Sequence, residues 1–148
     1  MINSDINFTC PYGGSLMSTT INLKQVAPFA IDVQGPNWSF RIDLPPKDGG
    51  GGTGPGPTDL VPAALAACEM MLALLTASRN GCPLTGVEAT VNKTYVSNPS
   101  RLGDMTVQLR NVLSQLPPQL HDRVKKAVDA CPVLKTLQQP PAITSEIS

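Results

Sequence analysis

Residues 60–77 (LVPAALAACEMMLALLTA) constrain the fold of this chain more than any other segment does. These 18 residues include a single charged side chain, Glu69, so we expect a helix that is surrounded by protein on all sides. The length borders on that of a membrane span. However, Pro62 and Glu69 interrupt the run and no aromatic belt flanks it, so we predict a buried helix of a soluble protein.

The residues around this run predict where the helix begins and ends. Pro62 has no backbone N–H and must lie in the first turn, which makes Asp59 the expected N-cap. We expect the helix to run to about Ser78 and to stop at Asn80-Gly81, because glycine favours the backbone conformation that ends helices.

The rest of the chain predicts antiparallel strands and two further helices. Short apolar stretches broken by turn residues predict strands within residues 2–44. Residues 87–92 and 105–110 alternate between apolar and polar side chains, which indicates a hairpin with its turn at 97–103. Helices are expected from Pro117-Pro118 and from Pro132, and a last strand at 143–147. This order predicts an α+β fold with an antiparallel sheet, in one domain of residues 1–148.

Residues 45–58 (PPKDGGGGTGPGPT) contain six of the 12 glycines and are expected to form an irregular loop. Such a loop beside the apolar helix is either functional or a flexible connector. Gly49, Gly51 and Gly54 match the pattern G-x-G-x-x-G, but prolines follow and no parallel βαβ pattern surrounds the match. No Gly-Lys-Ser/Thr follows either, so neither a dinucleotide site nor a phosphate-binding loop is expected.

The composition argues against several classes of partner. The 11 basic and 11 acidic residues give zero net charge without a basic block, so we expect no nucleic-acid binding and no membrane partner. Only 15% of the residues are charged, which indicates either a large subunit interface or a Pro/Gly-rich surface. The N-terminal segment MINSDINFTC lacks the features of a signal peptide, so we expect a cytoplasmic protein with reduced thiols.

Two of the four cysteines, 63 positions apart, lie in contrasting settings. Cys68 is deep in the apolar helix, where a thiol is usually an inert small hydrophobe. Cys131 precedes Pro132 and is the expected N-cap of a helix, whose dipole stabilises a thiolate. This contrast suggests a redox pair in a thiol enzyme that consumes an oxidant. Cys10 and Cys82 lie in loop contexts and are interpreted as incidental.

The sequence gives no sign of a metal site or another cofactor. The four cysteines show no C-x-x-C spacing, the only histidine is His121, and no H-x-x-x-H pair is present. Zinc sites are usually built from such closely spaced cysteine and histidine ligands. We therefore expect no metal and no cofactor.

Two segments resemble the signatures of the OsmC/Ohr family, which includes osmotically inducible protein C and organic hydroperoxide resistance protein. Residues 54–60 (GPGPTDL), followed by Ala66-Ala67-Cys68, resemble the first signature, and residues 126–133 (KAVDACPV) resemble the second. The order of elements and the length match over nearly the whole chain. The resemblance implies an OsmC-like fold, with antiparallel sheets around a long buried central helix. It also implies an intertwined homodimer with two active sites at the subunit interface.

The resemblance further implies thiol-dependent reduction of organic hydroperoxides in oxidative stress defence. By position, Cys68 is then the peroxidatic cysteine and Cys131 the resolving one. Attack of the Cys68 thiolate on the hydroperoxide gives a sulfenic acid, Cys131 forms a disulfide with it, and an external dithiol reduces that disulfide. No metal or haem takes part. The alternative is an OsmC-fold protein that binds a small molecule or another protein without peroxidase turnover.

The polar residues expected around the thiol depart from the family pattern. The family peroxidases hold the cysteine as a thiolate with an arginine and a glutamate, and Thr58 stands where that glutamate is expected. Asp59 is the nearest carboxylate, and its alternative role is that of a helix cap. Arg41 is the candidate arginine, or else a strand-surface residue, and Glu69 beside Cys68 either pairs across the dimer or faces water.

Overall fold

The computed structural model describes residues 19–148 of the chain. These residues divide into two compact units, with the boundary between Pro55 and Gly56. Cys10 and the strands predicted within residues 2–18 lie outside the described residues. The expectation of one domain over residues 1–148 stays a prediction.

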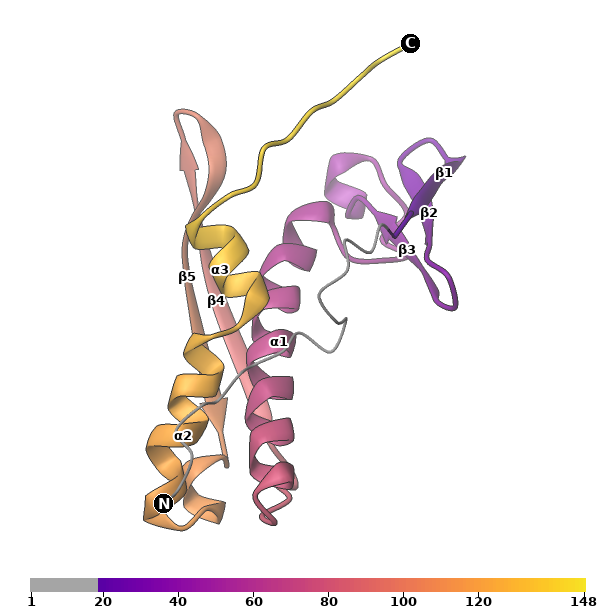
Figure 1. The fold of residues 1–148 in the computed structure, drawn as a ribbon. Helices are drawn as coiled ribbons and strands as arrows, with labels where there is room; N and C mark the ends of the chain where they lie inside the picture. Colours follow the sequence, from indigo (N-terminus) through magenta and orange to yellow (C-terminus); the bar gives the residue numbers. More distant parts are fainter. Residues whose placement is uncertain (1–18) are drawn as a thin grey trace. The chain divides into compact units, whose positions relative to one another are not determined.

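The first unit is built on a small antiparallel sheet with strand order β1-β2-β3. The strands are β1 (Asn22–Ala27), β2 (Ala30–Gln34) and β3 (Ser39–Asp43), joined by short turns (Figure 1). Asp32 of β2 stands directly opposite Arg41 of β3. A short 3-10 helix, η1 (Pro46–Asp48), lies inside the predicted irregular loop. The prediction of antiparallel strands before the glycine-rich segment is confirmed.

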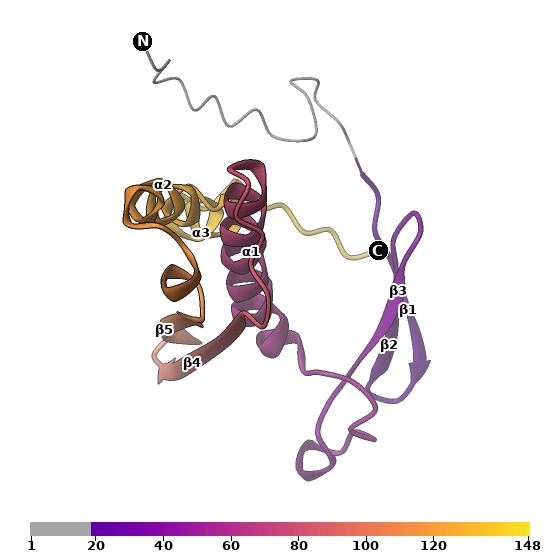
Figure 2. The ribbon, with the colours of Figure 1, turned by 90° about the horizontal axis from the view of Figure 1, so that it is seen from below.

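The second unit is organised around one long helix, α1 (Pro57–Arg79). The hairpin of β4 (Glu88–Ser97) and β5 (Ser100–Arg110) packs against this helix, and so do α2 (Pro118–Asp129) and α3 (Pro132–Gln138). A 3-10 helix, η2 (Leu113–Gln115), connects the hairpin to α2. Figures 1 and 2 show α1 beside both the hairpin and the two shorter helices. This arrangement confirms the predicted α+β class with a central helix.

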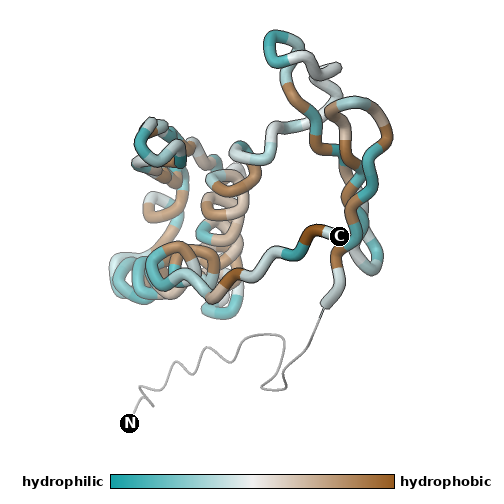
Figure 3. The backbone as a smooth tube through the Cα atoms, turned by 90° about the horizontal axis from the view of Figure 1, so that it is seen from above, coloured by the Kyte–Doolittle hydropathy of each residue, from teal (hydrophilic) through white to brown (hydrophobic). Residues whose placement is uncertain are grey.

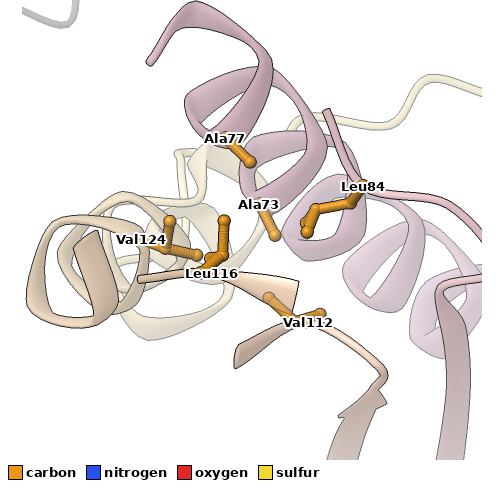
Figure 4. Close-up of a cluster of buried hydrophobic side chains, with 6 residues drawn as sticks. All are labelled: Ala73, Ala77, Leu84, Val112, Leu116 and Val124. Carbon is orange, nitrogen blue, oxygen red and sulfur yellow. The ribbon is translucent and has the colours of Figure 1, made fainter. Parts of the chain in front are cut away.

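A hydrophobic core joins α1 to α2 and to the loops that flank the hairpin. Ala73 and Ala77 of α1 are completely buried, because their small side chains let neighbouring elements approach closely. Figure 3 shows apolar residues along successive turns of α1. The buried cluster, drawn in Figure 4, consists of Ala73, Ala77, Leu84, Val112, Leu116 and Val124.

The start of α1 differs from the prediction. Gly56 is the N-cap and Pro57 is the first helical residue, so Asp59 is the third helical residue and not the cap. Proline is well suited to a first helical position because its φ angle is already helical and no N–H is needed there. The Asp59 carboxylate accepts the N–H of Gly56 at 3.0 Å, so Asp59 caps the helix from within its first turn. The predicted end is confirmed, with Gly81 at a φ of +75° just beyond Arg79.

The C-terminal half agrees with the prediction except at two places. The strands of the hairpin extend further than predicted, so that only Asn98-Pro99 separates β4 from β5. The predicted helices begin at Pro118 and Pro132. The predicted last strand at 143–147 is wrong, because no strand of either sheet pairs with these residues and they form neither helix nor strand.

One face of α1 is not covered by the other elements of the second unit. Its exposed side includes Ala64, Ala67, Met71 and Leu75, with Met71 67% exposed and Leu75 39% exposed. The expectation that protein surrounds the helix on all sides is therefore not met within the second unit. Among the described helices, α1 alone is long and apolar enough to cross a membrane. Its other faces pack into the core of the second unit, as those of a core helix do.

Candidate active site

The structure brings Cys68 and Cys131 together. Cys68 lies in the middle of α1, and Cys131 lies at the corner between α2 and α3. The Cys68 thiol is close enough to Cys131 to affect its pKa, and both are free cysteines. Cys131 is completely buried, whereas Cys68 is half-buried. Residues 63 positions apart in the chain thus form a dithiol in the second unit.

The geometry predicted for Cys131 is confirmed, but the predicted effect on its acidity is wrong. Cys131 is the N-cap of α3, and its Sγ accepts the backbone N–H of Leu134 at 3.4 Å. Burial, followed by the neighbouring Cys68 thiol, raises the pKa of the Cys131 thiol to about 11. The Leu134 N–H lowers this pKa but does not offset the loss of water, which disfavours the charged thiolate. Cys131 is therefore a neutral thiol at pH 7.

An apolar groove of about 410 Å³ lies between α1 and α3, next to the dithiol. Ala64 in its wall precedes Cys68 by one helical turn, and Pro132 follows Cys131 directly. Because the groove is almost entirely apolar, it suits a hydrophobic ligand better than a small polar one. It is lined by Leu60, Val61, Ala64, Pro132, Val133, Thr136 and Leu137.

The first turn of α1 is bonded to β4 through Lys93. Because Pro62 has no N–H, the carbonyl of Thr58 lacks the donor that normally comes from four residues later. Lys93 Nζ donates to this carbonyl at 3.3 Å and also forms an ion pair with Asp59. The hydroxyl of Tyr95 shares a hydrogen bond of 2.8 Å with Thr58 Oγ1. Lys93 thus takes over the role of the missing helix donor.

These contacts place Asp59 away from the thiols. The hydrogen bond from Lys93 holds the pKa of the Asp59 carboxyl below its usual range, and that from Gly56 acts in the same direction. Nine residues separate Asp59 from Cys68, which corresponds to about 13 Å along the helix axis. Within the second unit, the cation that pairs with Asp59 is Lys93. A role for Asp59 in thiol chemistry remains a prediction.

Arg41, the other predicted polar residue, is paired within the first unit. Its Nε donates to Asp32 Oδ1 at 2.6 Å, and a terminal nitrogen donates to Asp32 Oδ2 at 3.1 Å. The hydrogen bond to Asp32 raises the pKa of Arg41 and lowers the pKa of Asp32. The pair lines a polar pocket of about 520 Å³ together with Thr53. The predicted role of Arg41 beside the thiol stays a prediction.

Asp43 organises the glycine-rich loop. This carboxylate is 2% exposed, and its Oδ2 accepts the N–H of Gly51 at 3.1 Å and both the N–H and hydroxyl of Thr53. These hydrogen bonds hold the pKa of Asp43 below its usual range, and the bond from the Thr53 N–H has the largest effect. At Gly54, a Cβ would lie 2.2 Å from the Arg41 carbonyl oxygen, so glycine is required there. The loop therefore has a defined conformation and is not a flexible connector.

Sequence reasoning missed Lys93, Tyr95 and Asp43 as structural partners. Lys93 follows Val87, Ala89 and Val91 on the inward-facing side of β4. A lysine in this otherwise apolar series is the sequence signal that could have identified it as a structural partner. Cys82 packs half-buried against the hydrophobic core and not against the dithiol. Among the described residues, no group of three or more His, Cys, Asp or Glu side chains is arranged to hold a metal ion.

Comparison with known proteins identifies the family. The family model described as OsmC-like protein matches residues 49–146, about two thirds of the chain. The chain belongs to the OsmC-like protein family. The matched region contains Cys68, Cys131 and the apolar groove, and the family assignment agrees with the resemblance of the two signature segments. No curated protein matches the chain closely enough to count as a relative.

Solved structures of OsmC and Ohr proteins share the fold of this OsmC-like chain. An OsmC-like protein from Mycoplasma pneumoniae has 19% identity and a TM-score of 0.66, with 85% of this chain and 91% of that chain covered. An organic hydroperoxide resistance protein OsmC from Legionella pneumophila has 19% identity and a TM-score of 0.57, with 84% and 92% covered. The organic hydroperoxide resistance protein OhrB of Bacillus subtilis has 18% identity and a TM-score of 0.53, with 85% and 94% covered.

Proposed function

We propose that this OsmC-like protein reduces organic hydroperoxides, with Cys68 as the peroxidatic and Cys131 as the resolving cysteine. The observation that carries the proposal is the closeness of the Cys68 and Cys131 thiols, beside an apolar groove lined by residues adjacent to both cysteines in the chain or one helical turn away. Relatives of the same fold named as organic hydroperoxide resistance proteins support the choice of substrate. We further propose that the protein acts as a cytoplasmic homodimer.

The difference between the two thiols supports this division of roles. With a pKa of about 11, only roughly one Cys131 thiol in ten thousand is ionised at pH 7. Cys131 is also completely buried, whereas Cys68 is half-buried and therefore more accessible to a substrate. The first attack on a hydroperoxide requires an accessible thiolate, so Cys68 is the better candidate for that step.

The proposed reaction has three balanced steps. The Cys68 thiolate attacks the terminal oxygen of ROOH, the O–O bond breaks, and the alkoxide takes up a proton to leave as ROH. Cys68 is now a sulfenic acid, and attack by Cys131 forms the disulfide and releases water. An external dithiol reduces this disulfide by exchange and restores both thiols. The apolar lining of the groove favours lipid-like or aromatic hydroperoxides over hydrogen peroxide.

The test is consumption of cumene hydroperoxide by purified protein in the presence of a dithiol. We expect turnover by the wild type, none by Cys68→Ser, and a rate within about twofold of wild type for Cys82→Ser and Cys10→Ser. Serine is close in size to cysteine, so Cys68→Ser removes the nucleophile at little cost in packing. Undiminished turnover by Cys68→Ser contradicts the peroxidatic assignment.

A second candidate function is binding without turnover. Thr58 stands where the family glutamate is expected, and the neighbouring carboxylate Asp59 is already paired with Lys93. Under this alternative, the groove between α1 and α3 takes up an apolar molecule or a protein partner while the thiols stay unchanged. A wild-type protein that binds an apolar probe in the groove but consumes no hydroperoxide supports this alternative over the peroxidase.

A further inference from the structure

The apolar groove between α1 and α3 has two matching walls. On each helix, the lining residues follow one another at the spacing that places side chains on one face. The wall on α1 consists of Leu60, Val61 and Ala64, and the wall on α3 consists of Pro132, Val133, Thr136 and Leu137. The proposed hydroperoxide chemistry treats the groove only as an apolar surface and gives no separate role to any residue in it.

Thr136 is the lining residue whose side chain carries a polar atom. Its Oγ1 donates to the carbonyl oxygen of Pro132 at 2.8 Å, one turn earlier in α3. A threonine hydroxyl has a single proton, so a hydroxyl bonded to its own helix has none left to donate to a ligand. None of the lining side chains is charged. The groove walls therefore offer a ligand apolar contacts, with no charge and no free side-chain donor.

The position and the size of the groove indicate what occupies it. Ala64 precedes Cys68 by one helical turn and Pro132 follows Cys131 directly, so the walls include residues close to each thiol along its helix. The volume of about 410 Å³ lies near the lower end of the range for small-molecule sites, about 300–1,000 Å³. In a groove of this size, the bulk of one side chain changes which ligands fit.

We propose that the groove binds the organic group of the hydroperoxide and that Thr136 determines which organic groups are accepted, through apolar contact alone. This inference rests on the proposed function and extends it to specificity. Thr136 is exposed in the groove wall, so a larger side chain there takes up room that a ligand needs. The class accepted is hydroperoxides with a compact hydrocarbon group, because a charged group loses water in the groove and finds no partner.

A small organic group is favoured over a protein segment as the occupant. The groove has the volume of a small-molecule site, and its walls adjoin the two cysteines along both helices. A second copy of the chain is the competing occupant, since Ala64 also belongs to the uncovered face of α1. The two occupants differ in what they predict for a variant that fills the groove from α3.

The first measurement compares kcat/KM for cumene hydroperoxide and tert-butyl hydroperoxide, which differ by a phenyl group in place of a methyl group. We expect the wild type to favour cumene hydroperoxide at least about tenfold, because even one methylene in an apolar pocket can give such discrimination. Thr136→Phe should reduce this ratio to about twofold or less while retaining turnover of tert-butyl hydroperoxide. Lys135→Phe adds the same side chain at the neighbouring exposed position of α3, outside the groove, and should keep the wild-type ratio.

Thr136→Val tests whether the hydroxyl takes part. This variant keeps the branched shape of the side chain and removes only the group that donates to Pro132. We expect the wild-type ratio of the two hydroperoxides, because apolar contact does not need the hydroxyl. A ratio that falls as far as in Thr136→Phe overturns the inference, since it shows recognition through a polar contact.

The second measurement uses the product alcohols, so it needs no turnover. 2-Phenyl-2-propanol and tert-butanol are titrated into each protein, and the methyl signals of Val61, Val133 and Leu137 are followed by NMR. We expect the phenyl alcohol to shift these signals at a concentration at least about tenfold lower than tert-butanol in the wild type and in Lys135→Phe. In Thr136→Phe this difference should disappear. A protein that consumes no hydroperoxide but binds in this way contradicts the peroxidase proposal and still supports the groove.

Three results overturn the inference. One is a Thr136→Phe protein that keeps the wild-type ratio, and another is equal loss of activity toward both hydroperoxides, which indicates a structural effect. The third is a phenyl alcohol that shifts no groove signal in the wild type. Light scattering covers the competing occupant: a change of mass in Thr136→Phe, with unchanged affinity for the phenyl alcohol, shows that the groove is a contact between copies and also overturns the inference.

Discussion

The burial of the two cysteines determines what each thiol can do. Cys131 combines complete burial with a helix N-cap position, and burial has the larger effect on its pKa. An N-cap favours a thiolate only while water or another charge also supports the ionised form. Cys131 is therefore poorly suited to react first with a hydroperoxide, which agrees with the resolving role proposed for it.

Replacing Cys131 should separate the first oxidation from its resolution. In Cys131→Ser we expect one equivalent of an organic hydroperoxide still to oxidise Cys68, because Cys68 alone supplies that step. The sulfenic acid should then persist, react with dimedone, and proceed to the sulfinic form with excess hydroperoxide. Mass spectrometry of the Cys68 peptide measures these species. In the wild type the same treatment should give a Cys68–Cys131 disulfide, and a disulfide to Cys82 instead contradicts the resolving role.

Lys93 is the residue whose loss should most affect the first turn of α1. Lys93→Met retains most of the side-chain length but removes the donor to the Thr58 carbonyl and the partner of Asp59. We therefore expect a lower thermal unfolding midpoint, with the larger part of the effect caused by the unpaired carbonyl, since partly exposed ion pairs contribute little. Lys47→Met alters an exposed lysine without such contacts and should leave the midpoint unchanged. Equal midpoints for both variants contradict the proposed role of Lys93.

Among the larger structural elements, the glycine-rich loop is held in place by one carboxylate, that of Asp43. Its Oδ2 receives three hydrogen bonds from Gly51 and Thr53, which lie eight and ten residues further along the chain. Gly50 also passes so close to β3 and the residue after it that a Cβ would lie 2.0 Å from the Leu44 carbonyl oxygen. The glycine-rich segment that leads into α1 therefore has one defined conformation. Its stability depends on the ionisation of a single side chain.

This dependence gives a prediction for the effect of pH. The folded-state pKa of Asp43 is lowered, so its contribution to stability is fully present above the unfolded pKa of about 3.9 and is lost as the pH falls through the folded value. Asp43→Asn should lower the thermal midpoint at neutral pH, and the difference from wild type should shrink below about pH 4. Melting curves between neutral and acid pH measure this, with the exposed Asp48→Asn as control. A difference that is independent of pH contradicts the assignment.

The sequence predicted those elements whose signals are local. The apolar run, the glycine after Arg79 and the Cys131-Pro132 step were sufficient to predict α1, its end and the start of α3. The start of α1 was placed three residues too late, because Pro62 was assigned to the first turn and in the structure is the sixth helical residue. A helix tolerates proline at that depth when another group binds the freed carbonyl, and Lys93 is such a group.

Features that depend on long-range contacts could not be predicted. Residues 143–147 were predicted as a strand but pair with no strand among the described residues 19–148, and a sequence pattern does not reveal whether a partner exists. The acidity of Cys131 depends on how completely the corner between α2 and α3 is buried. The resemblance of the second signature implied that Cys131 would act with Cys68, but the hydrogen bond from Lys93 to the Thr58 carbonyl is visible only in the fold.

At the scale of the whole molecule, the uncovered face of α1 is the feature that most needs an explanation. Ala64, Ala67, Met71 and Leu75 recur at helical spacing and carry no charge, yet all four are exposed. Exposed apolar surfaces that extend along an element usually mark an interface. The chain is also low in charged residues, at 15% of the sequence. A second copy of the chain covering this face accounts for both observations and agrees with the proposed homodimer.

The dimer prediction is tested by placing a charge on this face. The wild type should have twice the chain mass of 15.6 kDa by light scattering at micromolar concentration, and obligate interfaces of this kind bury on the order of 2,000 Å² or more. Met71→Glu puts a carboxylate at the most exposed apolar position of α1, which should shift the mass toward the monomer because an unpaired charge is costly to bury. Glu88→Gln, on the exposed side of β4, should leave the mass unchanged. A monomeric wild type contradicts the prediction, and a Met71→Glu protein that remains a stable dimer places the interface elsewhere on the chain.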